Sequence, residues 1–485
     1  MTRPVKTPLL HAIEAYLQEN TTRFHMPGHK GKVRAGTPLQ RLLGERPFQV
    51  DLTEVPGLDD LHDPQEAIRA SEKIAAGIYG AKETFFLVNG ATAGIIAACL
   101  ALLQPGDKVI LPRHVHKSVF SALVLSGAVP VYVAPTYHPV LGIPLGVPAG
   151  RWEEAWDRHP DAKMVLFVHP TYEGIVSLHR ELVVRAKARG LKVVVDEAHG
   201  GHFPFHPELP RSSLALGADV VVQGSHKTLG SFTQSGMLHL GGELAREPFQ
   251  RALGLVQSTS PSYLLLASLE GALYEMVWHG EQDWEETMSL AGRIREEIKA
   301  CRGFRSWHEE LFNYNEVIGL DPTKIIIDGL KLGLTGYDLA KLLREEYTIQ
   351  VETAGQSHIL VLLGARDRWE EGKRLVDALG AIAQSRAGRG KSLPIPSFRE
   401  ELLLPEVVVS PRDSWFAAKK RVPLQEAENA VCGELVVPYP PGIPLLCPGE
   451  LIAAPMIRLL LRLREQGIHW QGLADPALNT IQVLA

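Results

Sequence analysis

The sequence has little of what membrane proteins and secreted disulfide-rich proteins require. Only four of its 485 residues are cysteines, Cys99, Cys301, Cys432 and Cys447, and no two of them form a CxxC pair. This scatter argues against a disulfide scaffold and favours reduced thiols in a cytoplasmic protein. The longest apolar run, 91–103, is too short to cross a bilayer, and the N-terminus lacks the apolar core of a signal peptide.

The chain also lacks a strong charge of either sign. Its net charge of -5 gives no reason to expect nucleic acid or an anionic membrane as a partner. Heptads, internal repeats and low-complexity tracts are absent as well. The content of 45% hydrophobic and 22% charged residues is usual for a soluble globular protein, and the length predicts two or three domains.

The hydrophobic pattern of the first half predicts strands that alternate with helices. A helix is expected after Asp63, with Asp63 as its N-cap and Gly80 as its stop. Alternation of this kind predicts a doubly wound α/β layer with a mostly parallel sheet. We expect strands at 84–88, 108–111, 129–133, 164–168, 193–195 and 220–222, and helices at 91–103, 118–125 and 181–189.

Two of these strands end in residues that suggest a cofactor. Lys227 follows the run 220–222, and Asp196 closes the run 193–195. Alone, Lys227 would be a solvated loop lysine. An aspartate and a lysine at the ends of neighbouring strands are, however, what pyridoxal phosphate requires: the lysine forms a Schiff base with the aldehyde, and the carboxylate keeps the pyridine nitrogen protonated.

Other strand ends carry polar residues that fit the same cofactor, because ligands bind beyond the carboxyl ends of parallel strands. Gly90 permits a sharp turn into a helix whose first amides, with Thr92, could bind a phosphate; a purely structural turn is the alternative. Ser225 and His226 could close the phosphate site. Two histidines are ambiguous. His116 could stack on the cofactor ring, and His199 could orient Asp196 or contact substrate, but both could equally be structural.

The remaining segments are less informative. The loop 24–31 contains two histidines but no matching carboxylates, so no metal site is expected. The acidic loop 51–64 is by default solvated surface. Later in the chain we expect a helix at 263–276, a small α/β domain with strands at 324–327, 351–352 and 359–363 and a helix at 336–345, and then a linker. The predicted divisions are 1–60, 61–285 (the large domain), 286–384, 385–397 (the linker) and 398–485 (a C-terminal α+β domain).

Several short motifs, taken together, resemble the bacterial ornithine/lysine/arginine decarboxylases. They extend over nearly the whole chain, and the linked set is far more specific than any one of them. The motifs are His-Met-Pro-Gly-His-Lys at 25–30, His-Lys-Ser at 116–118, Pro-Thr-Tyr at 170–172, Asp-Glu-Ala-His-Gly at 196–200, Gly-Ser-His-Lys at 224–227, Ser-Thr-Ser-Pro-Ser-Tyr at 258–263, Tyr-Pro-Pro-Gly-Ile-Pro-Leu at 439–445 and Pro-Gly-Glu at 448–450.

The resemblance implies a fold-type-I, pyridoxal-phosphate-dependent enzyme, at least dimeric, with its active sites at the dimer interface. The chain is similar to the short form of the family, whose relatives are arginine decarboxylases. One position departs from the family: Ala91 stands where a first hydroxyl residue is usual after Gly90, so somewhat weaker cofactor affinity is expected. The implied site residues are Lys227, Asp196, His116 and His199 for catalysis; Gly90, Ala91, Thr92, Ala198, Ser225, His226, Thr259 and Ser260 for the cofactor; and Glu450, Asp59 and Asp60 for the substrate.

The resemblance therefore predicts decarboxylation of a basic amino acid, with L-arginine, giving agmatine for polyamine biosynthesis, as the first expectation. Lysine and ornithine remain alternative substrates. A rigidly held carboxylate favours arginine, because a guanidinium can make two parallel hydrogen bonds to it. Two other readings remain open: a fold-type-I aminotransferase, which would share Lys227 and Asp196, and a non-catalytic pseudoenzyme that keeps the cofactor.

Overall fold

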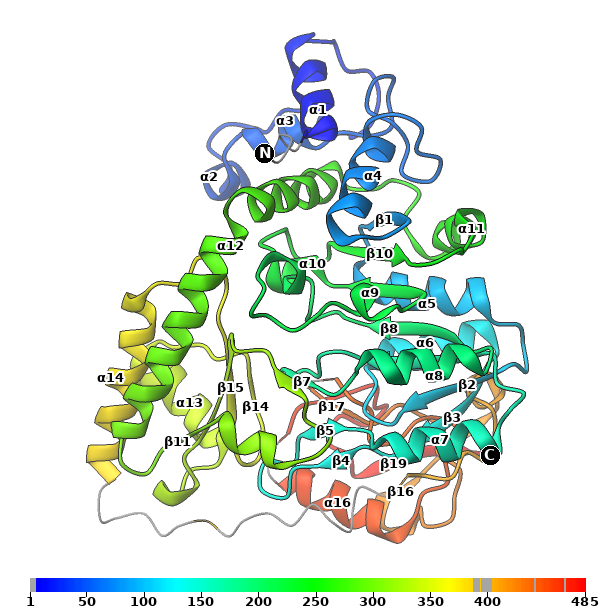
Figure 1. Cartoon of the computed structure of the whole chain (residues 1–485), viewed down its shortest axis with the longest axis vertical. Helices are drawn as coiled ribbons and strands as arrows, with labels where there is room; N and C mark the ends of the chain where they lie inside the picture. Colours follow the sequence, from blue (N-terminus) through cyan, green and yellow to red (C-terminus); the bar gives the residue numbers. More distant parts are fainter. Residues whose placement is uncertain (1–5, 387–392, 394–403, 440–441, 466–467) are drawn as a thin grey trace. The chain divides into compact units, whose positions relative to one another are not determined.

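The computed structural model describes residues 6–386, 393, 404–439, 442–465 and 468–485 (Figure 1). The chain divides into two compact units. Unit 1 comprises residues 1–101 and 194–284, and unit 2 comprises residues 102–193 and 285–485. No helix within the described ranges combines the length and the apolar character that crossing a membrane needs.

Unit 1 contains four strands in the order β1-β10-β9-β8. β8 and β9 are parallel, as predicted, whereas β10 is antiparallel to both of its neighbours. The register places Asp196, the last residue of β8, opposite Val222 of β9. The bounds are α1 (Pro8–Gln18), α2 (Pro38–Leu43), α3 (Arg46–Val50), α4 (Ala67–Tyr79), β1 (Glu83–Leu87), α5 (Gly90–Leu102), β8 (Lys192–Asp196), η1 (Phe203–Phe205), α9 (Ser213–Leu216), β9 (Val220–Gln223), α10 (Ser225–Thr228), β10 (Gly236–Leu240) and α11 (Arg246–Val256).

The start of α4 differs from the prediction. The helix begins at Ala67 rather than directly after Asp63, and Asp59 supplies the capping carboxylate. Its Oδ2 accepts hydrogen bonds from the backbone N–H groups of Glu66, Ile68 and Arg69 at 2.8–3.2 Å. A carboxylate at this end satisfies unpaired amides and complements the helix dipole. The predicted stop is confirmed, because Gly80 adopts the left-handed conformation with φ 68°.

Unit 2 contains three parallel strands in the order β6-β2-β3, which confirms the predicted parallel arrangement. A separate four-stranded antiparallel sheet has the order β11-β13-β15-β14. The first group comprises β2 (Lys108–Pro112), α6 (Lys117–Ser126), β3 (Val129–Val133), β4 (Thr136–Tyr137), β5 (Pro144–Gly146), α7 (Ala149–Arg158), β6 (Met164–Val168), β7 (Ile175–Val176) and α8 (Arg180–Ala188).

In the later part of the chain, hydrophobic periodicity did not predict every element boundary. The helix expected at 263–276 continues as α12 (Tyr263–Ala300), and the strand expected at 351–352 lies two residues later, as β14 (Thr353–Ala354). Most of the predicted linker, 385–397, lies outside the described residues, and Ser385 and Arg386 belong to α14. The other elements are β11 (Arg305–Trp307), η2 (Glu309–Asn313), β12 (Gly319–Leu320), β13 (Lys324–Asp328), η3 (Leu330–Leu332), α13 (Gly336–Tyr347), β15 (Ile359–Leu362) and α14 (Trp369–Arg386).

The C-terminal part of unit 2 has its own apolar core, formed by buried side chains such as Ile452, Leu460 and Ile481. Two short antiparallel pairs, β16–β19 and β17–β18, border this core. The elements are α15 (Pro411–Phe416), β16 (Lys419–Pro423), η4 (Leu424–Glu426), β17 (Val437–Pro438), α16 (Ala454–Glu465), β18 (Trp470–Gln471) and β19 (Thr480–Leu484).

Candidate active site

Lys227 lies on α10, the single helical turn that follows the fully buried strand β9. Its Nζ lies 2.9 Å from Nε2 of His199. Gly224 allows this arrangement, since a Cβ atom there would lie 3.3–3.4 Å from Cδ and Cε of Lys227. The structure thus places the predicted Schiff-base lysine beside the predicted histidine, and both belong to unit 1.

Asp196 is a buried carboxylate in the same unit, with 7% of its surface exposed. Its Oδ1 accepts a hydrogen bond from the backbone N–H of Ala198 at 3.1 Å. Burial raises the pKa of Asp196, whereas the charge of Lys227 and the Ala198 hydrogen bond lower it. A buried carboxylate needs a cationic partner to stay charged, and a pyridinium nitrogen is such a partner.

The turn predicted to bind phosphate begins α5. Gly90 has φ +73°, which is the left-handed conformation that favours glycine. Strand β10 packs closely against this turn: a Cβ at Gly236 would lie 2.7 Å from the Gln223 carbonyl oxygen and 3.3 Å from the Ala91 nitrogen. Periodicity in the sequence did not predict this contact, although a glycine in an apolar run signals close backbone approach.

Ser225 provides the test of whether these residues fit a phosphate group. Its side chain is fully buried, and its Oγ has no hydrogen-bond partner among the described residues. A buried hydroxyl without a partner is costly, so a phosphate oxygen at this position would satisfy it. Next to it, His226 is held by its Nδ1, which lies 2.8 Å from the Ser235 carbonyl oxygen, and burial lowers its pKa.

The other residues assigned to the phosphate end are more exposed. Thr92 lies in the first turn of α5, and its side chain is exposed. Thr259 and Ser260 are exposed in the segment that precedes α12. This segment approaches the phosphate turn, since the Ser258 N–H donates to the Asn89 side chain at 3.3 Å. The structure therefore brings Gly90, Thr92 and the 258–260 segment into one part of unit 1.

His116 and Glu450 belong to unit 2. His116 is the N-cap of α6, and its Nδ1 accepts a hydrogen bond from the Ser118 N–H. A Cβ at Gly442 would lie 3.2 Å from the His116 ring, so this glycine of the C-terminal segment packs against the histidine. Local sequence patterns do not indicate this contact, because more than 300 residues separate its two partners.

Glu450 is almost completely buried and forms an ion pair with Arg113 at 3.1 Å. Its Oε2 also accepts a hydrogen bond from the Cys447 N–H at 2.7 Å. Its Oε1 is buried and has no hydrogen-bond partner among the described residues. Burial raises the pKa of Glu450, and Arg113 lowers it. Because Oε2 is occupied, Glu450 does not offer the two free oxygens that the two parallel hydrogen bonds of a guanidinium need.

The two other carboxylates assigned to the substrate lie in the loop before α4. The Asp59 oxygens accept the backbone N–H groups described above, and its Oδ1 also accepts from Asp60 and Gln65. Backbone N–H groups thus occupy both oxygens of Asp59, and its assignment as a substrate ligand stays a prediction. Asp60 accepts one hydrogen bond, from the His62 N–H at 2.8 Å.

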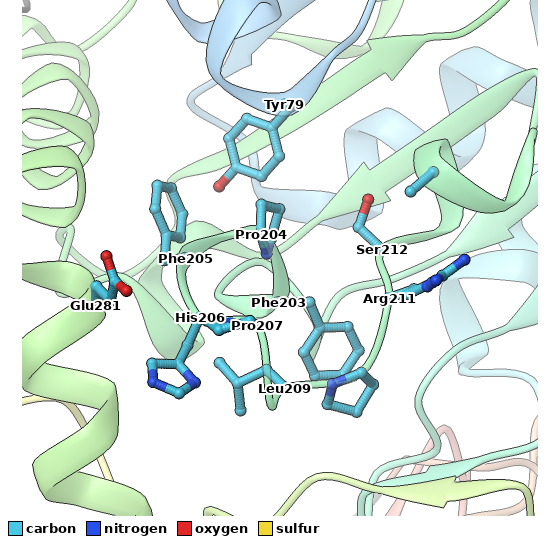
Figure 2. Close-up of a pocket in the computed structure, with 12 residues that line it drawn as sticks. Tyr79, Phe203, Pro204, Phe205, His206, Pro207, Leu209, Arg211, Ser212 and Glu281 are labelled. Carbon is cyan, nitrogen blue, oxygen red and sulfur yellow. The ribbon is translucent and has the colours of Figure 1, made fainter. Parts of the chain in front are cut away.

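A cavity of about 440 Å³ lies elsewhere in unit 1 (Figure 2). Aromatic and proline side chains form most of its wall, with Arg211 and Glu281 at its edges. None of the predicted site residues lines it. The described part of the chain contains no cluster of three or more histidine, cysteine, aspartate or glutamate side chains suited to a metal ion.

Comparisons with known proteins place the chain in a family. Residues 7–370 match the model "Orn/Lys/Arg decarboxylase, major domain", and residues 397–476 match its C-terminal domain. An arginine decarboxylase of Bacillus subtilis is 37% identical over 99% of this chain and 98% of its own length. One of Halalkalibacterium halodurans is 36% identical over 100% and 99%. The lysine decarboxylase LdcA of Pseudomonas aeruginosa is 26% identical over 91% and 73%.

Solved structures give the same fold. The lysine decarboxylase LdcF of Francisella novicida has a TM-score of 0.84 at 23% identity, covering 99% of this chain and 81% of its own. The alanine–glyoxylate aminotransferase of Nostoc sp. has a TM-score of 0.53 at 18% identity, covering 67% and 88%. These similarities confirm the predicted fold class, while the individual residue roles stay predictions. The chain belongs to the ornithine/lysine/arginine decarboxylase family and is a fold-type-I, pyridoxal-phosphate-dependent decarboxylase.

Proposed function

We propose that this enzyme decarboxylates L-arginine to agmatine and carbon dioxide. The observation that carries the choice of substrate is the difference in identity between two groups of relatives. Four arginine decarboxylases are 34–37% identical over 92–100% of the chain. Three lysine decarboxylases are 24–26% identical over 91–96% of it. Lysine or ornithine as the preferred substrate is the alternative.

We assign the covalent attachment of pyridoxal phosphate to Lys227. When bound, this cofactor stabilises the electron pair that stays on Cα as carbon dioxide leaves. Asp196 would pair with the ring nitrogen and keep it protonated; burial raises the pKa of this carboxyl, and a cation beside it opposes that rise. His116 would stack on the ring. Ala198, whose N–H orients Asp196, would lie at the ring's edge.

We assign proton transfer at the substrate's Cα to the Lys227–His199 pair. Their nitrogen atoms are 2.9 Å apart, so a proton can pass between them directly. We propose that Lys227 returns the proton to Cα after carbon dioxide leaves, and that His199 exchanges a proton with the Lys227 amine. His226 is the other candidate acid, but burial lowers its pKa and leaves it mainly neutral near pH 7.

We assign the phosphate end to the amides from Gly90 to Thr92, the Ser225 hydroxyl and His226, with Thr259 and Ser260 near the same turn. The buried Ser225 Oγ supports this assignment. For the substrate's guanidinium we propose Glu450 through its unpartnered Oε1, with Asp60 second. A single available oxygen makes one hydrogen bond rather than two, so arginine selectivity cannot rest on Glu450 alone.

We propose a cytoplasmic homodimer, or a higher homo-oligomer, with shared active sites, acting in polyamine biosynthesis. Large apolar side chains on the surface of unit 1 support self-association: Phe24 is 91% exposed, and Leu42 and Leu255 are each 79% exposed. Light scattering of the purified protein would measure the assembly, and a monomer at micromolar concentration would contradict this part of the proposal.

The substrate assignment is tested by incubating the cofactor-loaded enzyme with arginine, lysine and ornithine separately. We expect kcat/KM for arginine to exceed that for lysine by about tenfold or more, since an unpaired buried polar group costs roughly 1–3 kcal/mol. Mass spectrometry identifies the amines, and trapped carbon dioxide distinguishes decarboxylation from transamination, which releases a keto acid. A higher kcat/KM for lysine would refute the arginine preference and leave the decarboxylase assignment standing.

The cofactor assignment is tested by Lys227→Ala. We expect this variant to lose turnover and the visible absorbance of the cofactor–lysine adduct, because no other amine replaces Nζ. Lys117→Ala is a control, since this lysine lies in unit 2 and its Nζ bonds to Gln471. An unchanged absorbance spectrum in Lys227→Ala would show that another residue holds the cofactor.

A further inference from the structure

A row of buried polar side chains begins one residue after Asp196. We call it the Glu197 relay, and it consists of Glu197, Gln223, His239 and Thr84. Each of the four residues is fully buried in unit 1. The functional assignments above use none of them. Four fully buried polar side chains are costly unless they are mutually hydrogen-bonded, so their arrangement calls for a physical explanation.

Hydrogen bonds join the four side chains in one direction. The Glu197 Oε1 accepts from the Gln223 Nε2 at 2.7 Å, so the amide oxygen of Gln223 faces His239. That oxygen lies 3.1 Å from the His239 Nε2, which must therefore carry the hydrogen. The remaining ring nitrogen, Nδ1, then accepts from the Thr84 hydroxyl at 2.8 Å. Burial lowers the pKa of His239 to about 3, in keeping with a neutral ring.

Glu197 connects the relay to a third segment. Its second oxygen, Oε2, accepts from the backbone N–H of Ser213, the first residue of α9, at 2.5 Å. Glu197 itself follows β8, and Gln223 ends β9. One carboxylate therefore holds together the ends of two parallel strands and the start of a helix, with both of its oxygens satisfied by N–H donors.

Two of these three segments, the ends of β8 and β9, lead directly into residues proposed to hold the cofactor. Asp196 directly precedes Glu197, and Gly224 separates Gln223 from Ser225. The far end of the relay reaches the His199 loop through Tyr79, whose ring lies 4.4 Å from that of His239 and whose hydroxyl donates to the Gly201 carbonyl at 2.9 Å. Figure 2 shows Tyr79 above the loop that carries Pro204 and Ser212.

We propose that Glu197 is a positioning residue, which with Gln223 sets the separation between Asp196 and the Ser225–Lys227 turn without touching cofactor or substrate. The inference rests on the cofactor site proposed above. If it is correct, weakening the Glu197–Gln223 bond shifts both ends of the site at once. Cofactor affinity and kcat should then fall together, whereas a purely structural carboxylate would affect only the stability of the folded protein.

The test exchanges the two side chains. In Glu197→Gln, the new amide must turn its N–H group either toward Ser213, which is a donor, or toward Gln223, whose amide and the His239 tautomer must then reverse, so the wild-type arrangement of the relay is lost. We expect the dissociation constant for pyridoxal phosphate to rise and kcat to fall, each by roughly tenfold. The double variant Glu197→Gln/Gln223→Glu restores every donor–acceptor pair, because the amide introduced at position 197 donates to the carboxylate introduced at position 223 and still accepts from Ser213. It should recover both quantities to within about threefold of wild type.

The readouts are cofactor titration followed by visible circular dichroism, steady-state kcat and KM, and the Tm of the cofactor-free protein. Glu270→Gln is the matched control, since Glu270 is buried and accepts backbone N–H groups of α1. It should lower Tm and leave the circular dichroism of bound cofactor unchanged. If Glu197→Gln fails to fold, Thr84→Val breaks the relay at its far end and should weaken cofactor binding about twofold to fivefold.

An unchanged cofactor affinity and kcat in Glu197→Gln, or a double variant no better than the single one, would overturn the proposal. These outcomes are separate from failure of the cofactor site itself. If the cofactor site itself were wrongly assigned, Lys227→Ala would keep the visible absorbance, whatever the result of the Glu197 variants.

Discussion

At the scale of single residues, the chemical properties of each side chain in the candidate site depend on its immediate neighbours. Lys227 and Lys117 both follow parallel strands, but Lys227 lies beside His199 and a buried carboxylate, whereas the Lys117 Nζ bonds to an amide oxygen. Gly224 makes this possible by leaving room for the lysine stem. Asp196 shows the same dependence, because burial raises its pKa while Lys227 lowers it. The chemistry therefore follows from neighbours rather than from residue types alone.

Asp196→Asn tests the proposed pairing with the cofactor ring. The amide has the shape of the carboxylate but no charge, so we expect the cofactor to bind while kcat falls about 100-fold or more, equivalent to roughly 3 kcal/mol. Visible absorbance measures binding, and carbon dioxide release measures the rate. Asp328→Asn is a control at another buried aspartate, bonded to Trp307, and it should leave kcat unchanged. More than half of the wild-type kcat in Asp196→Asn would mean that Asp196 is structural.

At the scale of elements, α4 is a helix whose start depends on a residue eight positions before it. Asp59 accepts the amides of its first turn, whereas Asp63, the residue that local rules favour, bonds to the Gln65 side chain. Capping motifs read from sequence assume that the cap directly precedes the helix. Here the loop folds back, so the cap is an element-level feature that local spacing does not reveal.

Asp59→Ala should therefore destabilise the protein by about 0.5–2 kcal/mol, the usual cost of losing an N-cap. Asp60→Ala is the neighbouring control, because Asp60 bonds to a single loop amide, and it should cost less than about 0.5 kcal/mol. Urea unfolding measures both changes. Equal losses of stability in the two variants would contradict the capping role. A large fall in kcat/KM for arginine in Asp59→Ala, with stability unchanged, would support the substrate role of Asp59.

At the scale of the whole molecule, stability responds to pH through buried groups with opposite shifts. Burial lowers the pKa of His358 to about 4, so the folded protein keeps this ring neutral while the unfolded chain protonates it below about pH 6.5. The contribution of this neutral ring to the free energy of unfolding is therefore present above pH 6.5 and is lost as the pH falls toward 4. Burial raises the pKa of Glu72 to about 7, so its contribution changes in the opposite direction.

Because these contributions oppose each other, a variant is needed to separate one of them. Wild type should be more stable than His358→Asn at pH 7.5, and the advantage should shrink by about 1.4 kcal/mol per pH unit below pH 6.5. Urea unfolding of both proteins at pH 7.5, 6.5 and 5.5 measures the difference. If the difference in stability between the two proteins is the same at all three pH values, the pKa of His358 does not differ between the folded and unfolded states.

Features that depend on neighbours along the chain were predictable from the sequence. Strands β2, β3, β6, β8 and β9 were predicted to within one residue at each end, because continuous β-branched runs between turn residues mark buried parallel strands. The predicted family, cofactor and fold class were confirmed, since they rest on linked motifs along the whole chain. Gly80 ended its helix as predicted, because a left-handed stop is a local property.

Features that depend on partners distant in sequence came only from the tertiary structure. β10 is a short run containing a glycine and a histidine, and it is a strand because β1 and β9 lie on either side of it. The sequence indicates Glu450 as a substrate carboxylate but not its ion pair with Arg113, which lies more than 300 residues earlier. The sequence shows Glu197 only as part of a motif, and the structure shows that Gln223 and Ser213 donate hydrogen bonds to its two oxygens. Periodicity and capping act over a few residues, whereas burial and hydrogen-bond partners are decided when remote segments meet.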